Sequence, residues 1–332
     1  MTRAVFGLGP LERWLADPDV TEVMVNAGAD VWIERRPSTR CVSASGPATS
    51  GPQYAGTLDA GVLDAVLERV LAPIGRRLDR SSPVVDARLP DGSRVCAVVP
   101  PIAVDGPCLA IRRFGVESVP LDAFAPAPVR ALLAGLVDAR CNLLVSGATS
   151  AGKTTLLNGL AGLVAVNERI VTLEDTAELR LAAPHVLRLE ARPASPDGAP
   201  MVDLAMLLRT ALRLRPDRIV IGEIRGAEAT ELVQALNTGH DGSLATVHAN
   251  SPVDALARLE SLVVQASPAW TLDAVRDQVR RSIDVVIHVQ RDQGGRRHIA
   301  QIAEVDASTH GLSVRLLADH ASVLETPSRQ RR

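Results

Sequence analysis

In the middle of the chain a glycine-rich loop follows an apolar segment and precedes a helical pattern, an order that few folds accommodate. The apolar segment Asn142–Ser146 leads into residues 147–155, which read G-A-T-S-A-G-K-T-T. This loop matches G-x-x-x-x-G-K-S/T, in which backbone N–H groups and the start of the next helix cradle a phosphate. Its members are Gly147, Ala148, Thr149, Ser150, Ala151, Gly152, Lys153, Thr154 and Thr155. A strand, a phosphate loop and a helix in this order predict an α/β fold.

Lys153 is the only lysine of the chain, so all its other basic residues are arginines. An ammonium is a compact charge that fits among β- and γ-phosphate oxygens, where a planar guanidinium does not. The neighbouring Thr154 offers a hydroxyl to Mg²⁺. The loop therefore predicts that the chain binds ATP with Mg²⁺.

The composition limits the class of protein. The 332 residues correspond to about two domains, and 46% hydrophobic residues are ample for packed cores. A net charge of −2 and 2% aromatic residues argue against a nucleic-acid partner. No apolar run is long enough to span a membrane, and no signal peptide is recognisable, so we expect a cytoplasmic protein without a transmembrane segment. The spacing of the four cysteines fits neither a zinc site nor a disulfide framework.

Two domains and a linker are expected from the arrangement of apolar runs, helical patterns and prolines. Residues 1–114 are expected to form a smaller N-terminal α/β domain, 115–128 a proline-containing linker, and 129–332 the domain that carries the phosphate loop. In the first domain we expect a loop at 43–57, a helix capped by Thr57, and strands at Glu22–Asn26, Val31–Glu34, Val84–Leu89, Arg94–Val99 and Cys108–Arg113.

In the last domain, short apolar runs alternate with helical patterns, which is typical of a mostly parallel sheet covered on both faces. Strands are expected at Asn142–Ser146, Ile170–Leu173, Ile219–Ile221, Leu244–Val247 and Val285–Val289. Helices are expected from Gly152, at Met201–Leu214, at Ala227–Asn237 and over residues 272–283.

Acidic and histidine side chains follow three of these strands, at the edge where α/β proteins bind ligands. Glu223 follows Ile219–Ile221 and is the candidate for ordering a water or the Mg²⁺ shell. Glu174, with Asp175 and Glu178, holds a metal or its water in one interpretation and starts a solvated helix in the other. His248 ends the strand at Leu244–Val247 and is either a γ-phosphate sensor or a structural histidine.

Four ordered segments resemble the secretion ATPases of the type II/type IV superfamily, and most closely the CpaF/TadA branch that powers tight-adherence (Flp) pili. They read LVSGATSAGKTTLLN, VTLEDTAEL, LRPDRIVIGEIRG and TGHDGSLATVHANSP. N-terminal phrases such as SSPVVDARLPDGSRV resemble the same branch, so the likeness covers nearly the whole chain. It implies a RecA-like P-loop motor domain, a PAS-like N-terminal domain, and a ring-shaped homohexamer on the cytoplasmic side of an inner-membrane platform.

The resemblance also implies roles for individual residues. Residues 147–155 match the family's Walker A segment, Ile219–Glu223 its Walker B segment, and Glu174, Asp175 and Glu178 its acidic box. His240 and His248 match the histidine box. The catalytic candidates are Glu223, Glu174, His248, Arg112, Arg113, Arg88 and Arg94, of which the four arginines belong to the N-terminal domain; the metal-binding candidates are Thr154, Glu223 and Glu174. The arginines Arg209, Arg213, Arg215 and Arg218 are expected to form a solvated face or a subunit contact.

Ser150 departs from the family pattern, because it replaces a glycine that is common at this position of the loop. If the position requires a positive φ, the serine costs about 1 kcal/mol and slows turnover. The expected function is an Mg²⁺-dependent ATPase motor for pilus assembly or secretion. Two alternatives stay open: a RecA-like DNA-translocating ATPase, and a non-catalytic ATP-sensing scaffold.

Overall fold

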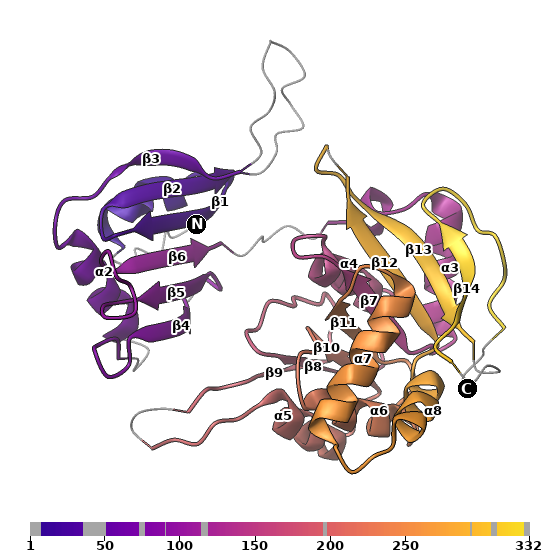
Figure 1. The fold of residues 1–332 in the computed structure, drawn as a ribbon. Coiled ribbons are helices and arrows are strands. Elements are labelled where there is room, and N and C mark those ends of the chain that lie inside the picture. Colours follow the sequence, from indigo (N-terminus) through magenta and orange to yellow (C-terminus); the bar gives the residue numbers. More distant parts are fainter. Residues whose placement is uncertain are drawn as a thin grey trace, which may run out of the picture. The chain divides into compact units, whose positions relative to one another are not determined.

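The computed structural model describes residues 8–35, 51–72, 77–89, 91–113, 119–194, 198–292, 294–306 and 311–328. They form two compact units, the first with the elements from η1 to β6 and the second with those from η3 to β14 (Figure 1). Each unit has its own sheet and its own hydrophobic core. No helix of the described residues is both long and apolar enough to cross a membrane.

The first unit is built on a six-stranded antiparallel sheet with the strand order β3-β2-β1-β6-β5-β4. Its strands are β1 (Val20–Asn26), β2 (Asp30–Arg35), β3 (Gln53–Thr57), β4 (Val84–Arg88), β5 (Arg94–Val98) and β6 (Cys108–Arg112). Apolar side chains alternate along these strands, so one face is buried against the helices and the other is more exposed. The five strands expected from the sequence are confirmed.

In the described part of the first unit, the helical elements are η1 (Gly9–Leu11), α1 (Glu12–Leu15) and α2 (Val62–Leu71). Helix α2 buries Leu63, Val66 and Leu67 in the core of this unit. The expected cap at Thr57 is wrong, because the helix starts later and its N-cap is Gly61 in a left-handed conformation. The expected loop at 43–57 is also partly wrong, since Gln53–Thr57 is the edge strand β3; residues 43–50 lie outside the described residues.

The second unit contains an eight-stranded sheet with the order β14-β13-β12-β7-β11-β10-β8-β9. The strands from β12 to β9 in this order are parallel, whereas β13 and β14 add an antiparallel extension. The strands are β7 (Leu143–Gly147), β8 (Ile170–Glu174), β9 (Val186–Glu190), β10 (Arg218–Ile221), β11 (Leu244–His248), β12 (Val285–Arg291), β13 (Arg297–Val305) and β14 (Val314–Asp319). The mostly parallel α/β sheet predicted around the phosphate loop is confirmed.

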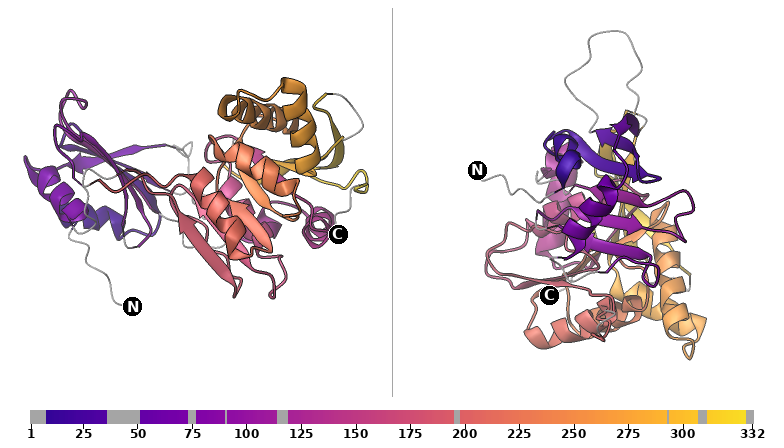
Figure 2. Two further views of the ribbon diagram at one scale, coloured as in Figure 1. Left: turned by 90° about the horizontal axis from the view of Figure 1, so that it is seen from below. Right: turned by 90° about the vertical axis from the view of Figure 1, so that its left-hand side faces the viewer.

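Helices cover both faces of this second sheet (Figures 1 and 2). Helices α3 (Ala127–Asp138) and α4 (Lys153–Ala161) pack in one apolar core. Helices α5 (Leu204–Ala211), α6 (Glu228–Leu236), α7 (Pro252–Ala266) and α8 (Leu272–Ser282) pack in the other, and η4 (Leu212–Leu214) follows α5. The sequence analysis did not predict α3, α7, β9, β13 or β14.

Residues 119–128 belong to the second unit, although the whole of 115–128 was expected to be a linker. The segment contains η3 (Leu121–Ala123), and α3 already begins at Ala127. Phe124 is 2% exposed and lies in the apolar core with α3 and α4. The described part of this segment is therefore packed, because a buried aromatic ring fixes it against the phosphate-loop helix; residues 115–118 lie outside the described residues.

Candidate nucleotide-binding site

The phosphate loop connects the end of β7 to the start of α4, as the sequence predicts. A Cβ at Gly147 would lie 2.5 Å from the backbone oxygen of Val289. At Gly152, where φ is +101°, a Cβ would lie 2.8 Å from Cδ of Arg297. Both glycines are therefore required, because any side chain would force the loop away from β12 or β13.

Ser150 has a φ of +62°, a left-handed conformation that glycine adopts without strain and other residues adopt at a cost. The expectation that this position requires a positive φ is confirmed. The loop therefore carries a small amount of backbone strain at a residue that directly precedes the Ala151–Gly152 turn into α4.

We predict that Ser150→Gly leaves ATP turnover unchanged or raises it, because glycine relieves about 1 kcal/mol of strain in the loop. Steady-state phosphate release at saturating ATP measures the effect. The matched control is Ala27→Gly, which relieves a similar φ of +50° in the first unit and should leave turnover unchanged. A large loss of activity in Ser150→Gly would show that the serine side chain itself is needed.

Lys153 is held inside the loop that it belongs to. Its Nζ donates hydrogen bonds to the backbone oxygens of Gly147, at 3.1 Å, and Ala148, at 3.0 Å. The side chain is buried, and burial lowers the pKa of Lys153, against the opposing effect of the Glu223 charge. The same Nζ lies 3.3 Å from both ring nitrogens of His248. The ammonium therefore already lies at the mouth of the phosphate loop. When a nucleotide binds, its phosphate oxygens would replace the carbonyl oxygens as hydrogen-bond partners of Nζ.

Glu223 and His248 lie together at the carboxyl edge of the sheet. Oε1 of Glu223 is 2.8 Å from Nε2 of His248, and Oε2 is 2.5 Å from an Nη atom of Arg225. Burial and then the charge of Lys153 lower the pKa of His248 below its ordinary value, so its imidazole is neutral at pH 7. Lys153, Glu223 and His248 form one polar cluster because β7, β10 and β11 are neighbouring parallel strands that end at the same edge.

Glu174 ends β8 and is 3% exposed. Its Oε1 accepts hydrogen bonds from the backbone N–H groups of Glu178 and Leu179, each at 2.8 Å. Its Oε2 is buried and accepts no hydrogen bond in the described part of the chain. Burial raises the pKa of Glu174 to about 7. A Cβ at Gly222 would lie 2.9 Å from Cγ of Glu174, so the carboxyl group packs beside the residue that precedes Glu223. The interpretation as a solvated helix start is therefore wrong for Glu174, because its side chain is buried.

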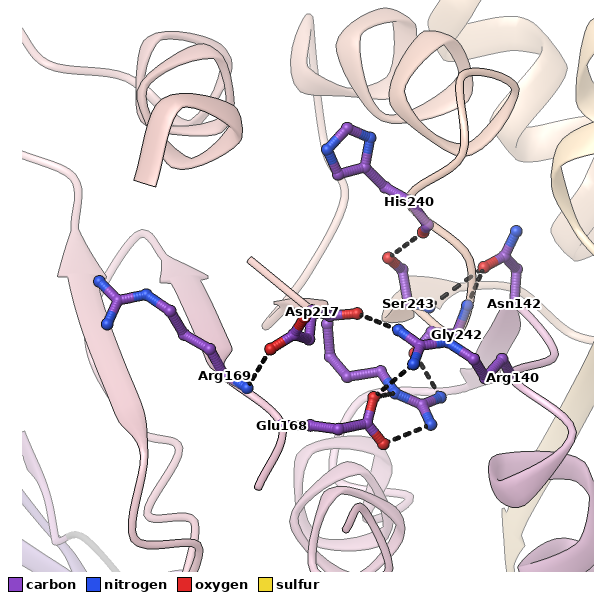
Figure 3. A network of polar contacts seen from close by, with 9 residues as sticks. Arg140, Asn142, Glu168, Arg169, Asp217, His240, Gly242 and Ser243 are labelled. Carbon is purple, nitrogen blue, oxygen red and sulfur yellow. Dashed lines mark hydrogen bonds and ion pairs between the residues drawn. The ribbon is translucent and has the colours of Figure 1, made fainter. Parts of the chain in front are cut away.

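His240 lies at the opposite edge of the sheet, before β11 starts, whereas His248 lies where that strand ends. It belongs to a network that joins the amino ends of the central strands (Figure 3). There the backbone oxygen of His240 accepts a hydrogen bond from Ser243, and Oδ1 of Asn142 accepts from the backbone N–H groups of Gly242 and Ser243. The two histidines of the presumed histidine box are thus separated, and only His248 is near the phosphate loop.

Arg218 was expected to be a solvated or subunit-contact arginine, and this is wrong. It is 3% exposed and binds Glu168 through two hydrogen bonds, of 2.8 Å from Nε and 2.9 Å from Nη2. Glu168 also pairs with Arg140 at 2.9 Å (Figure 3). Because the ion pair is buried and bidentate, it holds the start of β10 to the loop before β8.

The candidate arginines of the first unit divide into two groups. Arg88, Arg94 and Arg112 stand directly opposite one another across β4, β5 and β6. Arg113 instead donates to the backbone oxygens of Asp17, at 2.5 Å, and Val20, at 3.2 Å, and so fixes a loop of its own unit. Arg112 also lies in register with Glu22 of β1, and its charge opposes the effect of burial on the pKa of that carboxyl group.

Arg225 is a residue of the cluster that the sequence analysis missed. It lies two positions after Glu223 and contacts its carboxylate. A charged residue so soon after the acidic end of an apolar strand is a signal that could have identified it, since a short loop keeps both side chains at the same edge.

Comparisons with known proteins show what the chain as a whole is similar to. A family model described as "Type II/IV secretion system protein" matches residues 5–311. A putative conjugal transfer protein of Mycobacterium tuberculosis is 39% identical, with 98% of this chain and 94% of that protein covered. The conjugal transfer protein TrbB of Rhizobium radiobacter is 33% identical, with 85% and 83% covered. The crystal structure of the pilus retraction motor PilT with bound ADP has a TM-score of 0.64 at 18% identity, covering 91% of this chain and 84% of that one. The last similarity concerns the fold alone.

Proposed function

Because the chain belongs to the type II/IV secretion system protein family, we propose that it is a motor that hydrolyses ATP to drive pilus assembly or secretion. The observation that carries the proposal is the cluster of Lys153, Glu223 and His248 at the mouth of a phosphate loop. A cation for the phosphates and a carboxylate for the attacking water are the two groups that an ATPase needs at this position.

The residues present fit Mg²⁺ held together with ATP. Thr154 is half-buried at the start of α4, and Oε1 of Glu223 is a buried oxygen that accepts no hydrogen bond in the described part of the chain. No three metal-ligating side chains gather there among the described residues. This agrees with Mg²⁺, which is usually bound by one or two protein oxygens together with substrate phosphates. When bound, Mg²⁺ neutralises charge on the β- and γ-phosphate oxygens.

Each residue of the cluster has a definable task in hydrolysis. The backbone N–H groups of residues 147–155 bind the phosphates, and Lys153 moves from its carbonyl partners to the phosphate oxygens. Glu223 orients the attacking water through Oε1. We assign γ-phosphate sensing to His248, because it lies between Lys153 and Glu223 and loses its positively charged neighbour when Lys153 turns to the nucleotide.

Glu174 is proposed as an outer support of the Mg²⁺ shell. One of its oxygens is committed to the turn at Glu178 and Leu179, so only Oε2 is available to a metal-bound water. A carboxyl group whose pKa is about 7 releases its proton readily when a cation approaches. Glu174 would therefore lose its proton and become a carboxylate when Mg²⁺ is bound nearby.

The row of Arg88, Arg94 and Arg112 is proposed to supply positive charge to the γ-phosphate during hydrolysis. The supporting observation is that the pairing of their strands places the three arginines in register. Arg113 is left out of this role, because its guanidinium is committed to the backbone of its own unit.

We predict that changing Arg94 and Arg112 together to alanine lowers kcat at least about a hundredfold while ATP still binds, because an arginine at the γ-phosphate acts chiefly in the transition state. Steady-state turnover and equilibrium nucleotide binding measure the two effects. Arg35→Ala is the control, since Arg35 is a partly exposed arginine of the same unit that pairs with Asp17. Equal turnover in the double variant and the wild type would exclude these arginines from catalysis.

The assembly and its setting are also proposals. We infer a ring-shaped homohexamer that works against an inner-membrane platform, at the inner face of the cytoplasmic membrane. We also propose that the chain belongs to the CpaF/TadA branch of tight-adherence pilus assembly, because the four sequence segments quoted above resemble that branch. The relatives named above are described as conjugal transfer proteins.

Phosphate release by the full-length chain, with and without duplex DNA, tests the proposed function. We expect release that requires Mg²⁺ and is not stimulated by DNA, and a molar mass near six chains in the presence of nucleotide. Strong stimulation by DNA would favour a DNA-translocating ATPase. Tight ATP binding without release would favour an ATP-sensing scaffold, for which the strained φ of Ser150 is the supporting observation.

A further inference from the structure

We propose that Arg225 is a positioning residue for Glu223, which it holds so that one carboxylate oxygen stays directed at the phosphate loop. This inference rests on the proposed ATP hydrolysis. Arg225 donates from Nη2 to Oε2 of Glu223 at 2.5 Å, and the two residues are separated by Ile224 alone. Because Ile224 is 2% exposed and packs in the core, the short segment between them is anchored.

The backbone at Arg225 is fixed independently of its side chain. The N–H groups of Arg225 and Gly226 both donate to Oε1 of Glu228, at 2.5 and 2.8 Å. Glu228 is 6% exposed and lies in the first turn of α6, where a carboxylate is favourable. The guanidinium therefore extends from a defined point, although 59% of the Arg225 side chain is exposed.

Acidic groups from two segments of the chain act on the guanidinium. The hydrogen bond with Glu223 is the main cause that raises the pKa of Arg225, and Asp175 and Glu178, from the loop after β8, add to it. The other oxygen of Glu223, Oε1, lies 2.8 Å from Nε2 of His248, and His248 in turn lies 3.3 Å from Nζ of Lys153. Arg225 and His248 therefore contact different oxygens of the same carboxylate.

The two oxygens of the Glu223 carboxylate therefore differ in their partners. Oε2 is occupied by Arg225, whereas Oε1 is buried and accepts no hydrogen bond in the described part of the chain. Nε2 of His248 is 2.8 Å from Oε1, but the approach lacks hydrogen-bond alignment. Oε1 is therefore the oxygen that remains for a water at the γ-phosphate, and a fixed rotamer keeps it there. Arg225 acts through Glu223 rather than on the reacting atoms.

The first test is Arg225→Ala in the full chain. We expect kcat to fall about 10- to 100-fold, while the KM for ATP and the affinity for a non-hydrolysable ATP analogue change less than about twofold, because no phosphate contact is removed. Arg225→Lys keeps a donor and a charge and should recover part of kcat. The thermal midpoint should stay within about 2 °C of the wild type, since the side chain is mostly exposed.

The second test is a double-mutant cycle with Glu223→Gln. If Arg225 acts through Glu223, Arg225→Ala causes no further loss in that background. The matched control is Arg209→Ala, which breaks another exposed pair, between Arg209 and Glu231 at 2.6 Å, and should leave kcat unchanged. Equal losses in both backgrounds, or faster turnover in Arg225→Ala, would contradict positioning. A wild-type chain that releases no phosphate would overturn the proposed function and with it this inference, whereas a wild-type rate in Arg225→Ala would overturn this inference alone.

Discussion

Changing Lys153 to alanine is expected to lower ATP turnover at least about a thousandfold while the fold is retained. The variant removes the charge at the mouth of the loop, and no other lysine exists to replace it. The ammonium contacts loop carbonyls and His248, and Lys153 is not a member of either apolar core of its unit, so its removal leaves these cores unchanged. Phosphate release and far-ultraviolet circular dichroism measure the two outcomes.

Lys153→Arg is the matched variant, because it keeps the charge and changes only its shape. Turnover should be severely impaired, since a planar guanidinium does not fit where Nζ lies about equally close to two carbonyls and an imidazole. Turnover equal to the wild type in Lys153→Arg would contradict the argument that the loop requires the one lysine of the chain.

The second large effect is expected at Glu223. Glu223→Gln should bind ATP with nearly unchanged affinity and hydrolyse it at least about a hundredfold more slowly, because the amide keeps the shape but orients water poorly. Nucleotide binding at equilibrium and single-turnover hydrolysis separate the two quantities.

A collapse of ATP affinity in Glu223→Gln would assign a different role to this residue. The carboxylate would then serve chiefly as a Mg²⁺ ligand, since a metal ligand supports binding as much as turnover. Glu231→Gln is a suitable control, because Glu231 pairs with Arg209 elsewhere in the same unit.

Most of the central sheet could be predicted from the sequence, for a clear physical reason. Buried parallel strands such as Ile170–Glu174 are continuous apolar runs, and their pattern does not depend on distant parts of the chain. Edge elements were harder to predict. Strand β3 is polar and largely exposed, so it resembles a loop until its pairing with β2 is known. Helix α7 was missed although Ser251 caps it and Pro252 begins it, a signal that was available in the sequence.

The residues of the site that come after predicted strands could be identified from the sequence. Lys153, Glu223 and His248 each follow a predicted strand, and the parallel order brings them together. Partners that depend on tertiary contacts were not predictable. Arg218 pairs with Glu168, which is 50 residues away, and no local pattern distinguishes it from the exposed arginines near it. Arg113 follows Arg112 directly, and only the structure shows that its guanidinium donates to the backbone oxygens of Asp17 and Val20.

The proposed function depends on hydrolysis at the phosphate loop, and a single-turnover experiment tests this most directly. Full-length protein in excess over γ-labelled ATP is mixed with Mg²⁺, and phosphate release is followed over time, in parallel with Glu223→Gln. We predict complete release by the wild type, none when Mg²⁺ is chelated, and bound but uncleaved ATP in Glu223→Gln. Tightly bound ATP that the wild type leaves uncleaved in the presence of Mg²⁺ would contradict the proposal.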